Sequence, residues 1–287
     1  MMRYAMIGAA GYIAPKHMEA IMATGGELVA ACDISDSVGI LDRYFPDCEF
    51  FTSPERFQRH ITKHNDFDYL VVCTPNYLHD AHIRMGLYAG VDIICEKPMV
   101  IKPKNVRLLS NEAASFGSKI NVIQQMRLHP AFYEIDGCQP EWWRVRLDGL
   151  YQVKVNYVAP RGKWYHQSWK GDAEKSGGLA MNIGIHVFDL LIQIFGGLTG
   201  VYNVHTTENS IMGYLTLKGA DVDFNLSIDA NKKAKRELII DKHVVDFSQG
   251  LEDLHIKSYQ KIIAACGFVP EDVRPALELV DILSQWI

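Results

Sequence analysis

The sequence has no large charge excess and no Cys-x-x-Cys motif, and because its first residues show no basic segment, h-region or cleavage site, we expect no leader. Its 29 Lys and Arg against 34 Asp and Glu give a net charge of −5, which offers no general polyanion-binding surface, so we expect neither nucleic acid nor an acidic membrane as a partner. The six cysteines never form Cys-x-x-Cys, and three of them lie in apolar strand-like runs, which favours a reducing cytoplasm: Cys32, Cys73 and Cys95. The chain starts directly with an apolar strand pattern, and no apolar run approaches a membrane span.

Patterns for metal and phosphate binding are weak. His60 and His64, and likewise His79 and His82, are spaced as on one face of a helix, but neither pair has a third ligand in pattern, so we predict no metal. The basic run "NKKAKRE" at 231–237 is interpreted as a solvated hairpin rather than a phosphate site.

Length and hydrophobic patterning predict two domains. The 287 residues, 48% of them hydrophobic, suffice for a sizeable core in each. In residues 1–125, short apolar runs alternate with longer helical patterns: "RYAMIGA", "ELVAACD", "FDYLVVCTP", "VDIICEKP" and "SKINVIQQ". Parallel strands covered on both faces lose polar alternation, so this rhythm predicts an α/β domain with a doubly wound sheet.

Residues 126–287 have a different texture. In "VDFNLSID" every second residue is apolar, which predicts an open, mainly antiparallel sheet buried on one side within an α+β domain. Five more segments would supply strands: "LYQVKVNYV", "VYNVHTTE", "IMGYLTLK", "RELIID" and "HVVDFS". We expect helices at about 252–266 and 272–286 to close the chain, and "EIDGCQPE" to be the boundary loop.

The first chemical signal is the glycine-containing turn "IGAAGYIAPKH". Gly8, Ala10, Gly11 and Ala14 are small residues between a strand and a helix, where backbone N–H groups can hold a pyrophosphate. The spacing departs from Gly-x-Gly-x-x-Gly, and such a turn also occurs without a ligand.

Asp33 strengthens this interpretation. It ends the second strand, roughly twenty residues beyond the glycines, where a carboxylate accepts hydrogen bonds from both ribose hydroxyls of adenosine. Asp36 follows, and no Arg or Lys stands beside Asp33 to receive a 2′-phosphate, so NAD is favoured over NADP. The alternative is that Asp33 is a helix N-cap.

The next signals follow the fourth and fifth apolar runs. The carboxyl edge of a parallel sheet binds ligands, so the polar residues of "CTPNYLH" should lie along the cofactor, although Pro75 also suits a simple helix start. "VDIICEKP" ends at the same edge with Lys97. A partly desolvated lysine there would have a pKa lowered toward the range of a proton carrier. The alternative is a surface pair of Glu96 and Lys97 at a strand end.

A polar stripe occurs on an otherwise apolar helical pattern in "SGGLAMNIGIHVFDLLIQIFG". Asn182, His186 and Asp189 follow at spacings of four and three, hence on one face. The alternative to a functional site is a structurally satisfied histidine at an interface.

Together these motifs resemble the glucose–fructose oxidoreductase/inositol dehydrogenase (Gfo/Idh/MocA) family, above all through Glu96-Lys97-Pro98 and the Gly-Gly…His-x-x-Asp pattern. The resemblance covers nearly the whole chain. It implies a Rossmann domain followed by an open antiparallel sheet, with Lys97 and His186 as catalytic residues. Asn182 stands where most members have Asp, which removes a carboxylate beside His186. The implied NAD-binding residues are Gly8, Ala10, Gly11, Tyr12, Ile13, Asp33, Ile34, Thr74, Pro75, Asn76, His79, Glu96 and Lys97.

Longer motifs, among them "RGKWYHQSWKGD" and "NIGIH", resemble the bacterial UDP-N-acetylglucosaminuronate 3-dehydrogenases of lipopolysaccharide synthesis. Arg161, Lys163 and Lys170 offer cations for a diphosphate or uronate, and the neighbouring aromatics offer faces for uracil or a sugar ring. The alternative is a connecting loop whose aromatic side chains fill core. The substrate-binding residues implied are Lys97, Arg161, Trp164, Tyr165, Trp169, Lys170, Asn182 and His186.

The resemblance implies an NAD-dependent oxidation of the substrate 3-hydroxyl, with Lys97 or His186 accepting the proton. It also implies a homotetramer and, as in some of these enzymes, reoxidation of bound NADH by 2-oxoglutarate. Arg127 is a candidate for holding the oxidant's carboxylate, or else forms an interdomain salt bridge. The alternatives to this function are another sugar or cyclic polyol dehydrogenase, and a non-catalytic NAD-binding sensor.

Overall fold

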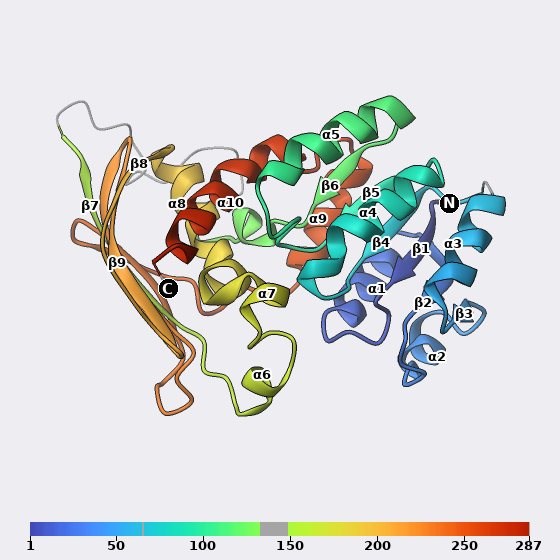
Figure 1. The fold of residues 1–287 in the computed structure, drawn as a ribbon, viewed down its shortest axis with the longest axis horizontal. Coiled ribbons are helices and arrows are strands. Elements are labelled where there is room, and N and C mark those ends of the chain that lie inside the picture. The colour runs from blue at the N-terminus through green and yellow to red at the C-terminus, as the bar shows by residue number, and fades with distance from the viewer. Residues whose placement is uncertain (65, 133–148, 287) are drawn as a thin grey trace. The chain divides into compact units, whose positions relative to one another are not determined.

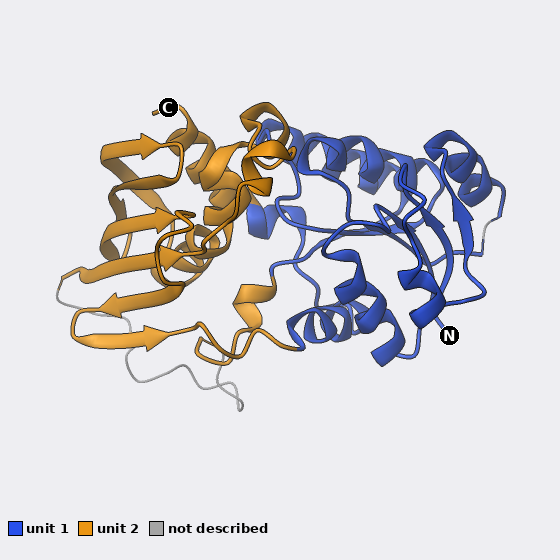
Figure 2. Cartoon of the chain, turned by 90° about the horizontal axis from the view of Figure 1, so that it is seen from below, with its two compact units in different colours: residues 1–124, 253–273 blue, residues 125–252, 274–287 orange. Residues whose placement is uncertain are grey.

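The structure is a computed structural model that describes residues 1–64, 66–132 and 149–286 (Figure 1). The chain divides into two compact units, residues 1–124 with 253–273 and residues 125–252 with 274–287 (Figure 2). The prediction placed everything after residue 125 in the second domain, whereas residues 253–273 belong to the first unit. The predicted boundary loop "EIDGCQPE" lies outside the described residues.

The first unit is built on a six-stranded parallel sheet in the order β3-β2-β1-β4-β5-β6. Its strands are β1 (Arg3–Ile7), β2 (Glu27–Cys32), β3 (Glu49–Phe51), β4 (Tyr69–Val72), β5 (Asp92–Cys95) and β6 (Ile120–Val122). Every residue of β4 is buried, as expected for a strand covered on both faces. The sequence therefore predicted the doubly wound sheet correctly, but not β3, whose three residues are too short a run to show a pattern.

Two groups of helices cover this sheet. Helices that follow strands progressing in opposite directions from β1 pack on opposite faces, because parallel crossovers are right-handed. One group contains α1 (Ala14–Ala23), α2 (Ile40–Tyr44) and α9 (Leu254–Ile263), and the other contains α3 (Pro54–Lys63), α4 (His79–Tyr88) and α5 (Lys104–Phe116). Helix α9 thus brings residues from beyond 250 back to the first unit, where Tyr259 is fully buried and packs on the ring of Tyr4.

The second unit contains a six-stranded mixed sheet in the order β12-β11-β7-β10-β9-β8. The pair of β7 and β10 is parallel and the other pairs are antiparallel. All six predicted segments form strands: β7 (Tyr151–Val158), β8 (Leu198–Thr207), β9 (Ser210–Leu217), β10 (Ala220–Ser227), β11 (Lys235–Ile240) and β12 (His243–Asp246). The alternation also holds, since the apolar residues of "VDFNLSID" are all at most 1% exposed.

The core of the second unit lies between this sheet and α8 (Ile185–Phe195). The Phe188 ring on α8 meets the Phe224 ring edge-on, with centroids 5.3 Å apart. A side chain at Gly184 would collide with Phe188 and Leu226, so glycine lets the start of α8 approach the sheet. Phe188→Ala should lower the free energy of unfolding by about 3–5 kcal/mol, which denaturant unfolding would measure. Short helices of this unit precede α8 in the chain, namely η2 (Gln125–Leu128), α6 (Trp164–Gln167) and α7 (Ala173–Ser176). The last helix, α10 (Pro270–Ser284), contains the boundary between the units at residues 273 and 274.

The apolar helical stretch Ala173–Phe195 corrects one expectation. Of the helices within the described ranges, it alone is long and apolar enough to cross a membrane by length and composition. The sequence analysis had expected no such segment. In its most apolar window, 67% of the stretch is buried inside the fold, which is typical of a core helix.

Candidate active site

The glycine turn after β1 is compact enough to present its backbone to a ligand. Gly8 has φ +93°, and a Cβ on it would lie 2.6 Å from the carbonyl carbon of Cys73 and 2.7 Å from the Thr74 nitrogen. A Cβ on Gly11 would come within 3.0 Å of the Gly8 oxygen, which itself accepts a 3.0 Å hydrogen bond from the Gly11 N–H. Only glycine fits at Gly8, a side chain at Gly11 would press on the Gly8 carbonyl, and helix α1 begins three residues later at Ala14.

Asp33 is tied to this turn. Its Oδ2 accepts a 2.9 Å hydrogen bond from the Ala10 N–H, and its Oδ1 accepts a 2.9 Å bond from the Ser35 N–H. The N-cap alternative is wrong, because α2 begins only at Ile40 and its N-cap is Gly39. Tyr12 and Ile34, both assigned to the cofactor by resemblance, are 91% and 84% exposed. Both side chains are therefore accessible to a ligand beside the glycine turn.

The residues after β4 form a second part of the same sheet edge. Pro75 precedes the short helix η1 (Asn76–Leu78), so it does also mark a helix start. Thr74 Oγ1 lies 2.9 Å from His82 Nδ1, and burial, followed by the nearby His79, lowers the pKa of His82 to about 4. His82 is therefore neutral at physiological pH.

His79 is 1% exposed, with Nδ1 2.7 Å from the Pro98 carbonyl oxygen and Nε2 2.7 Å from the Thr74 carbonyl oxygen. It ties the loop after β4 to the loop after β5. Burial lowers its pKa, although two flanking carbonyls favour a ring with two N–H donors. Direct contact of His79 with a cofactor stays a prediction.

Lys97 follows β5 and is half-buried, and its peptide bond to Pro98 is cis. The neighbouring Glu96 is only 4% exposed, so the alternative of a surface pair at a strand end is wrong. The Glu96 carboxylate instead accepts hydrogen bonds from His17 and His255, each at 3.0 Å. These partners could not be predicted from the sequence, because they lie 79 and 159 positions away from Glu96.

In the second unit, the predicted polar stripe lies on and just before α8. Asn182 lies in the π-helical turn Ala180–Gly184, an irregularity frequent at functional sites, and its Nδ2 donates a 2.9 Å hydrogen bond to the Tyr165 hydroxyl. Burial raises the pKa of Tyr165, and the bond from Asn182 partly offsets that. His186, one turn later, is half-buried. The position at which the resembled pattern has Asp therefore holds an amide that is hydrogen-bonded to a phenol.

Arg127 forms a buried ion pair with the last residue of the stripe. Its Nε and Nη2 donate to Asp189 at 2.7 and 2.6 Å, and the two side chains are 7% and 2% exposed. Both residues belong to the second unit, so the predicted alternative of a salt bridge is found, but within one unit. The guanidinium is therefore already engaged by a protein carboxylate.

The segment "RGKWYHQSWKGD" gathers cations and rings. The Lys170 ammonium lies 5.1 Å from the Trp164 ring centroid and 5.3 Å from that of Trp169. Burial and then the charge of Arg161 lower the pKa of Lys170. Tyr165 is buried, as the core-filling alternative expected, whereas Trp164 is 52% exposed. The segment therefore contributes to the core and also presents an aromatic and cationic surface.

Both halves of the chain match the Gfo/Idh/MocA family. Residues 2–124 match its "Oxidoreductase family, NAD-binding Rossmann fold", and residues 146–228 match its "Oxidoreductase family, C-terminal alpha/beta domain". The chain belongs to the Gfo/Idh/MocA oxidoreductase family. Its first unit is accordingly an NAD-binding Rossmann domain, and the compact turn, Asp33 and the exposed side chains beside them fit that cofactor.

Solved structures are similar over the whole chain. The WlbA (WbpB) dehydrogenase from Thermus thermophilus, in complex with NAD and UDP-GlcNAcA, is 39% identical with a TM-score of 0.92, over 99% of this chain and 95% of that one. A second crystal structure of that dehydrogenase, in complex with NAD and alpha-ketoglutarate, is 38% identical with a TM-score of 0.91, over 100% of this chain and 96% of that one.

Curated relatives are more distant. The D-glucoside 3-dehydrogenase of Escherichia coli K12 is 25% identical over 199 residues, which are 68% of this chain and 54% of that protein. The glucose-6-phosphate 3-dehydrogenase of Bacillus subtilis is 22% identical over 74% of this chain and 54% of that protein. The chain thus spans about half the length of these relatives.

Proposed function

We propose that the protein uses NAD⁺ to oxidise the 3-hydroxyl of UDP-N-acetylglucosaminuronate. The observation that carries the proposal is the similarity over 99% of the chain to a dehydrogenase crystallised with NAD and UDP-GlcNAcA. The chain also has intact Lys97 and His186, and a cationic and aromatic segment suited to a charged nucleotide sugar. Such an enzyme would work in the cytoplasm, in the synthesis of a bacterial surface polysaccharide.

In this reaction NAD⁺, when bound, accepts the hydride from C3 of the sugar. Lys97 or His186 accepts the proton of the 3-hydroxyl, so that the alcohol becomes a ketone with no charge left on its oxygen. Asn182 cannot take a proton from His186 as a carboxylate would. The amide instead holds Tyr165, which leaves the proton transfer to Lys97 and His186.

The position of oxidation tests this proposal directly. UDP-N-acetylglucosaminuronate with deuterium at C3 should transfer its label to NADH, as measured by mass spectrometry of the separated cofactor. Label retained in the sugar, while NADH still forms, would mean oxidation at another carbon. That result would favour the second candidate, another sugar or cyclic polyol dehydrogenase, to which the curated relatives are similar.

Arg161 should discriminate between charged and neutral substrates. If its guanidinium binds a diphosphate or uronate, Arg161→Ala should raise KM for the nucleotide sugar by about 10-fold or more, with a much smaller effect on a neutral sugar analogue. Lys233→Ala, which removes an exposed cation from the run 231–237 that we interpret as a solvated hairpin, is the control. Equal losses on both substrates would rule out the anion-binding role.

Reoxidation of NADH within the protein is a further part of the proposal, supported by the similar dehydrogenase crystallised with alpha-ketoglutarate. We expect the purified protein to carry NAD(H), and 2-oxoglutarate to bleach the NADH absorbance of substrate-reduced protein. Arg127, the candidate for holding the oxidant's carboxylate, already donates its Nε and Nη2 to Asp189. Protein isolated free of cofactor and unresponsive to 2-oxoglutarate would indicate ordinary release of NADH.

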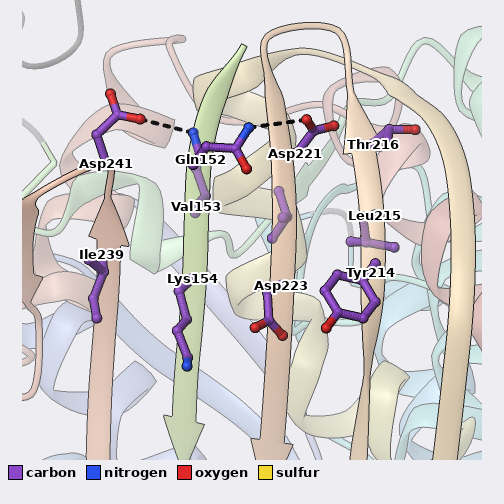
Figure 3. A pocket seen from close by; sticks show the side chains of 11 residues that line it. Gln152, Val153, Lys154, Tyr214, Leu215, Thr216, Asp221, Asp223, Ile239 and Asp241 are labelled. Carbon is purple, nitrogen blue, oxygen red and sulfur yellow. Dashed lines mark hydrogen bonds between the residues drawn. The ribbon is translucent and has the colours of Figure 1, made fainter.

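We propose a homotetramer in which the open face of the second-unit sheet takes part. On this face Tyr202 and Tyr214, paired across β8 and β9, are 52% and 51% exposed. A shallow pocket of about 470 Å³, lined in part by Tyr214, lies over β9, β10, β7 and β11, with Lys154 and Asp223 on its two middle strands (Figure 3). Such an aromatic patch on an open sheet suits a second copy of the chain.

Light scattering tests this assembly. Wild-type protein should have the mass of four chains, and Tyr202→Glu combined with Tyr214→Glu should give a smaller species, because a charge buried at an interface is costly. Tyr88→Glu on α4, where the side chain is 67% exposed, is the matched control. A tetramer unchanged by the double substitution would exclude this face.

A further inference from the structure

A buried hydrogen-bonded cluster in the first unit surrounds Glu96, the residue that precedes Lys97. It consists of His17 from α1, Glu96 after β5, and His255 and Tyr259 from α9, with exposures of 0%, 4%, 8% and 0%. His17 Nε2 and His255 Nε2 each lie 3.0 Å from Glu96 Oε1, and His17 Nδ1 lies 2.9 Å from the Tyr259 hydroxyl. Nothing in the resemblance or the proposed reaction uses the two histidines or the tyrosine.

The chemistry of the groups fixes the direction of these bonds. Burial alone would raise the pKa of Glu96, but the bonds from His17 and His255 outweigh it and hold the pKa well below its ordinary value. An ionised carboxylate only accepts, so both Nε2 atoms must donate. Burial lowers the pKa of His17, so its ring is neutral and Nδ1 is an acceptor. The Tyr259 O–H therefore donates to His17 Nδ1, and His17 in turn donates from Nε2 to Glu96.

The second oxygen of the carboxylate reaches the lysine. Glu96 Oε2 accepts a 3.1 Å hydrogen bond from the Lys97 backbone N–H. The Glu96 N–H donates to the Val72 carbonyl oxygen at 3.0 Å, which fixes the same residue to β4. The backbone from which the Lys97 side chain projects is therefore held on one side by the sheet and on the other by a carboxylate oriented by α1 and α9.

We propose that His17 and His255 are positioning residues for Lys97. They orient the Glu96 carboxylate and keep it ionised, so that it holds the Lys97 peptide in place for proton transfer. The inference rests on the proposed function of Lys97. It also explains why α9, far along the chain, belongs to the Rossmann unit: it delivers His255 and Tyr259 to the end of β5.

His17, Glu96 and His255 could instead be ligands of a metal ion, since their possible ligand atoms all lie within 4.8 Å of one another. The hydrogen bonds argue against this. Each Nε2 directs its N–H at Glu96 Oε1, whereas a metal ligand must present a lone pair. The carboxylate is also occupied on its other oxygen by Lys97.

Substitution at His255 tests the positioning role. His255→Leu should lower kcat about 10- to 100-fold, with KM for NAD⁺ and for the sugar changed less than about 3-fold. His255→Gln, whose amide N–H can stand near the Nε2 position, should restore most of kcat, whereas the shorter His255→Asn should not. In the Lys97→Ala background, His255→Leu should have little further effect.

Three controls keep the test decisive. Ile262→Ala, a core truncation on the same face of α9, reports loss of packing alone. A kcat loss in His255→Leu no greater than in Ile262→Ala, or a Gln variant no better than Asn, would overturn the inference. The Gln and Asn comparison decides the matter if His255→Leu does not fold. A stoichiometric transition metal in purified protein, lost in His255→Gln, would also overturn it.

One readout does not depend on turnover. Nitrogen-15 NMR of the His17 ring should show the neutral form protonated at Nε2 in wild type, and an altered tautomer balance in Glu96→Gln. If wild-type protein shows this tautomer but oxidises no sugar, the proposed function is wrong and the description of the cluster still holds. An Nδ1-protonated ring in wild type would overturn the cluster itself.

Discussion

Lys97→Ala should lower kcat on the order of 10²-fold or more while leaving NAD affinity nearly unchanged. A general base acts on the reacting hydroxyl and not on the adenosine or diphosphate, so its loss should appear in the chemical step. Steady-state kinetics with the nucleotide sugar and a fluorescence titration with NADH measure the two quantities. His186→Ala should also be slow, and the double variant should lose less than the sum of the single losses if the two residues share one relay.

Lys104→Ala is the matched control, because Lys104 is an exposed lysine seven residues later at the start of α5. It should turn over as wild type does. Near-normal kcat in Lys97→Ala would assign Lys97 to the structure of the strand end and leave His186 as the proton acceptor.

NADP⁺ should bind more weakly than NAD⁺ by about 2 kcal/mol or more, roughly 30-fold in Kd. The reason is the carboxylate of Asp33, fixed beside the glycine turn by its bond from Ala10, with Asp36 close by in the chain. A 2′-phosphate would meet negative charge where the ribose hydroxyls of NAD find an acceptor. Titration of cofactor-free protein with each dinucleotide measures the difference.

Asp33→Asn separates charge from hydrogen bonding, since its amide oxygen can still accept from Ala10. The variant should bind NAD⁺ less well, and the ratio of the Kd for NADP⁺ to the Kd for NAD⁺ should fall by about 10-fold. Asp36→Asn, which removes a neighbouring exposed charge, should lower this ratio much less. Equal affinities for the two dinucleotides in wild-type protein would contradict this placement of Asp33.

The elements that local pattern determines could be predicted from the sequence. Continuous apolar runs such as Tyr69–Val72 gave the parallel strands, and strict alternation in Ala220–Ser227 gave a sheet buried on one side. The position of Asp33 beside the glycine turn could be predicted because it ends the second strand, which lies next to the first strand in a sheet of this kind. These signals are local, so one sequence contains them.

The tertiary partners of the same residues could not be predicted. Glu96 and His255 are 159 positions apart, and no periodicity links them. The bonds of Asn182 to Tyr165 and of Arg127 to Asp189 likewise join separate elements whose meeting depends on the packing of the second unit. The high hydropathy of Ala173–Phe195 is also explained by tertiary packing, because a helix that is apolar over most of its circumference is typical of a protein core.

The most direct test of the proposed function is turnover with NAD⁺ over a panel of nucleotide sugars. The panel should contain UDP-N-acetylglucosaminuronate, UDP-N-acetylglucosamine, UDP-glucuronate and free inositol, with 2-oxoglutarate present so that NADH does not accumulate on the protein. We expect kcat/KM to be highest for UDP-N-acetylglucosaminuronate, by about 10-fold or more over UDP-N-acetylglucosamine. The sugar of the latter carries no carboxylate, so it cannot make a charge-assisted contact through that group. Neutral sugars oxidised as readily as the uronate would contradict the proposed substrate.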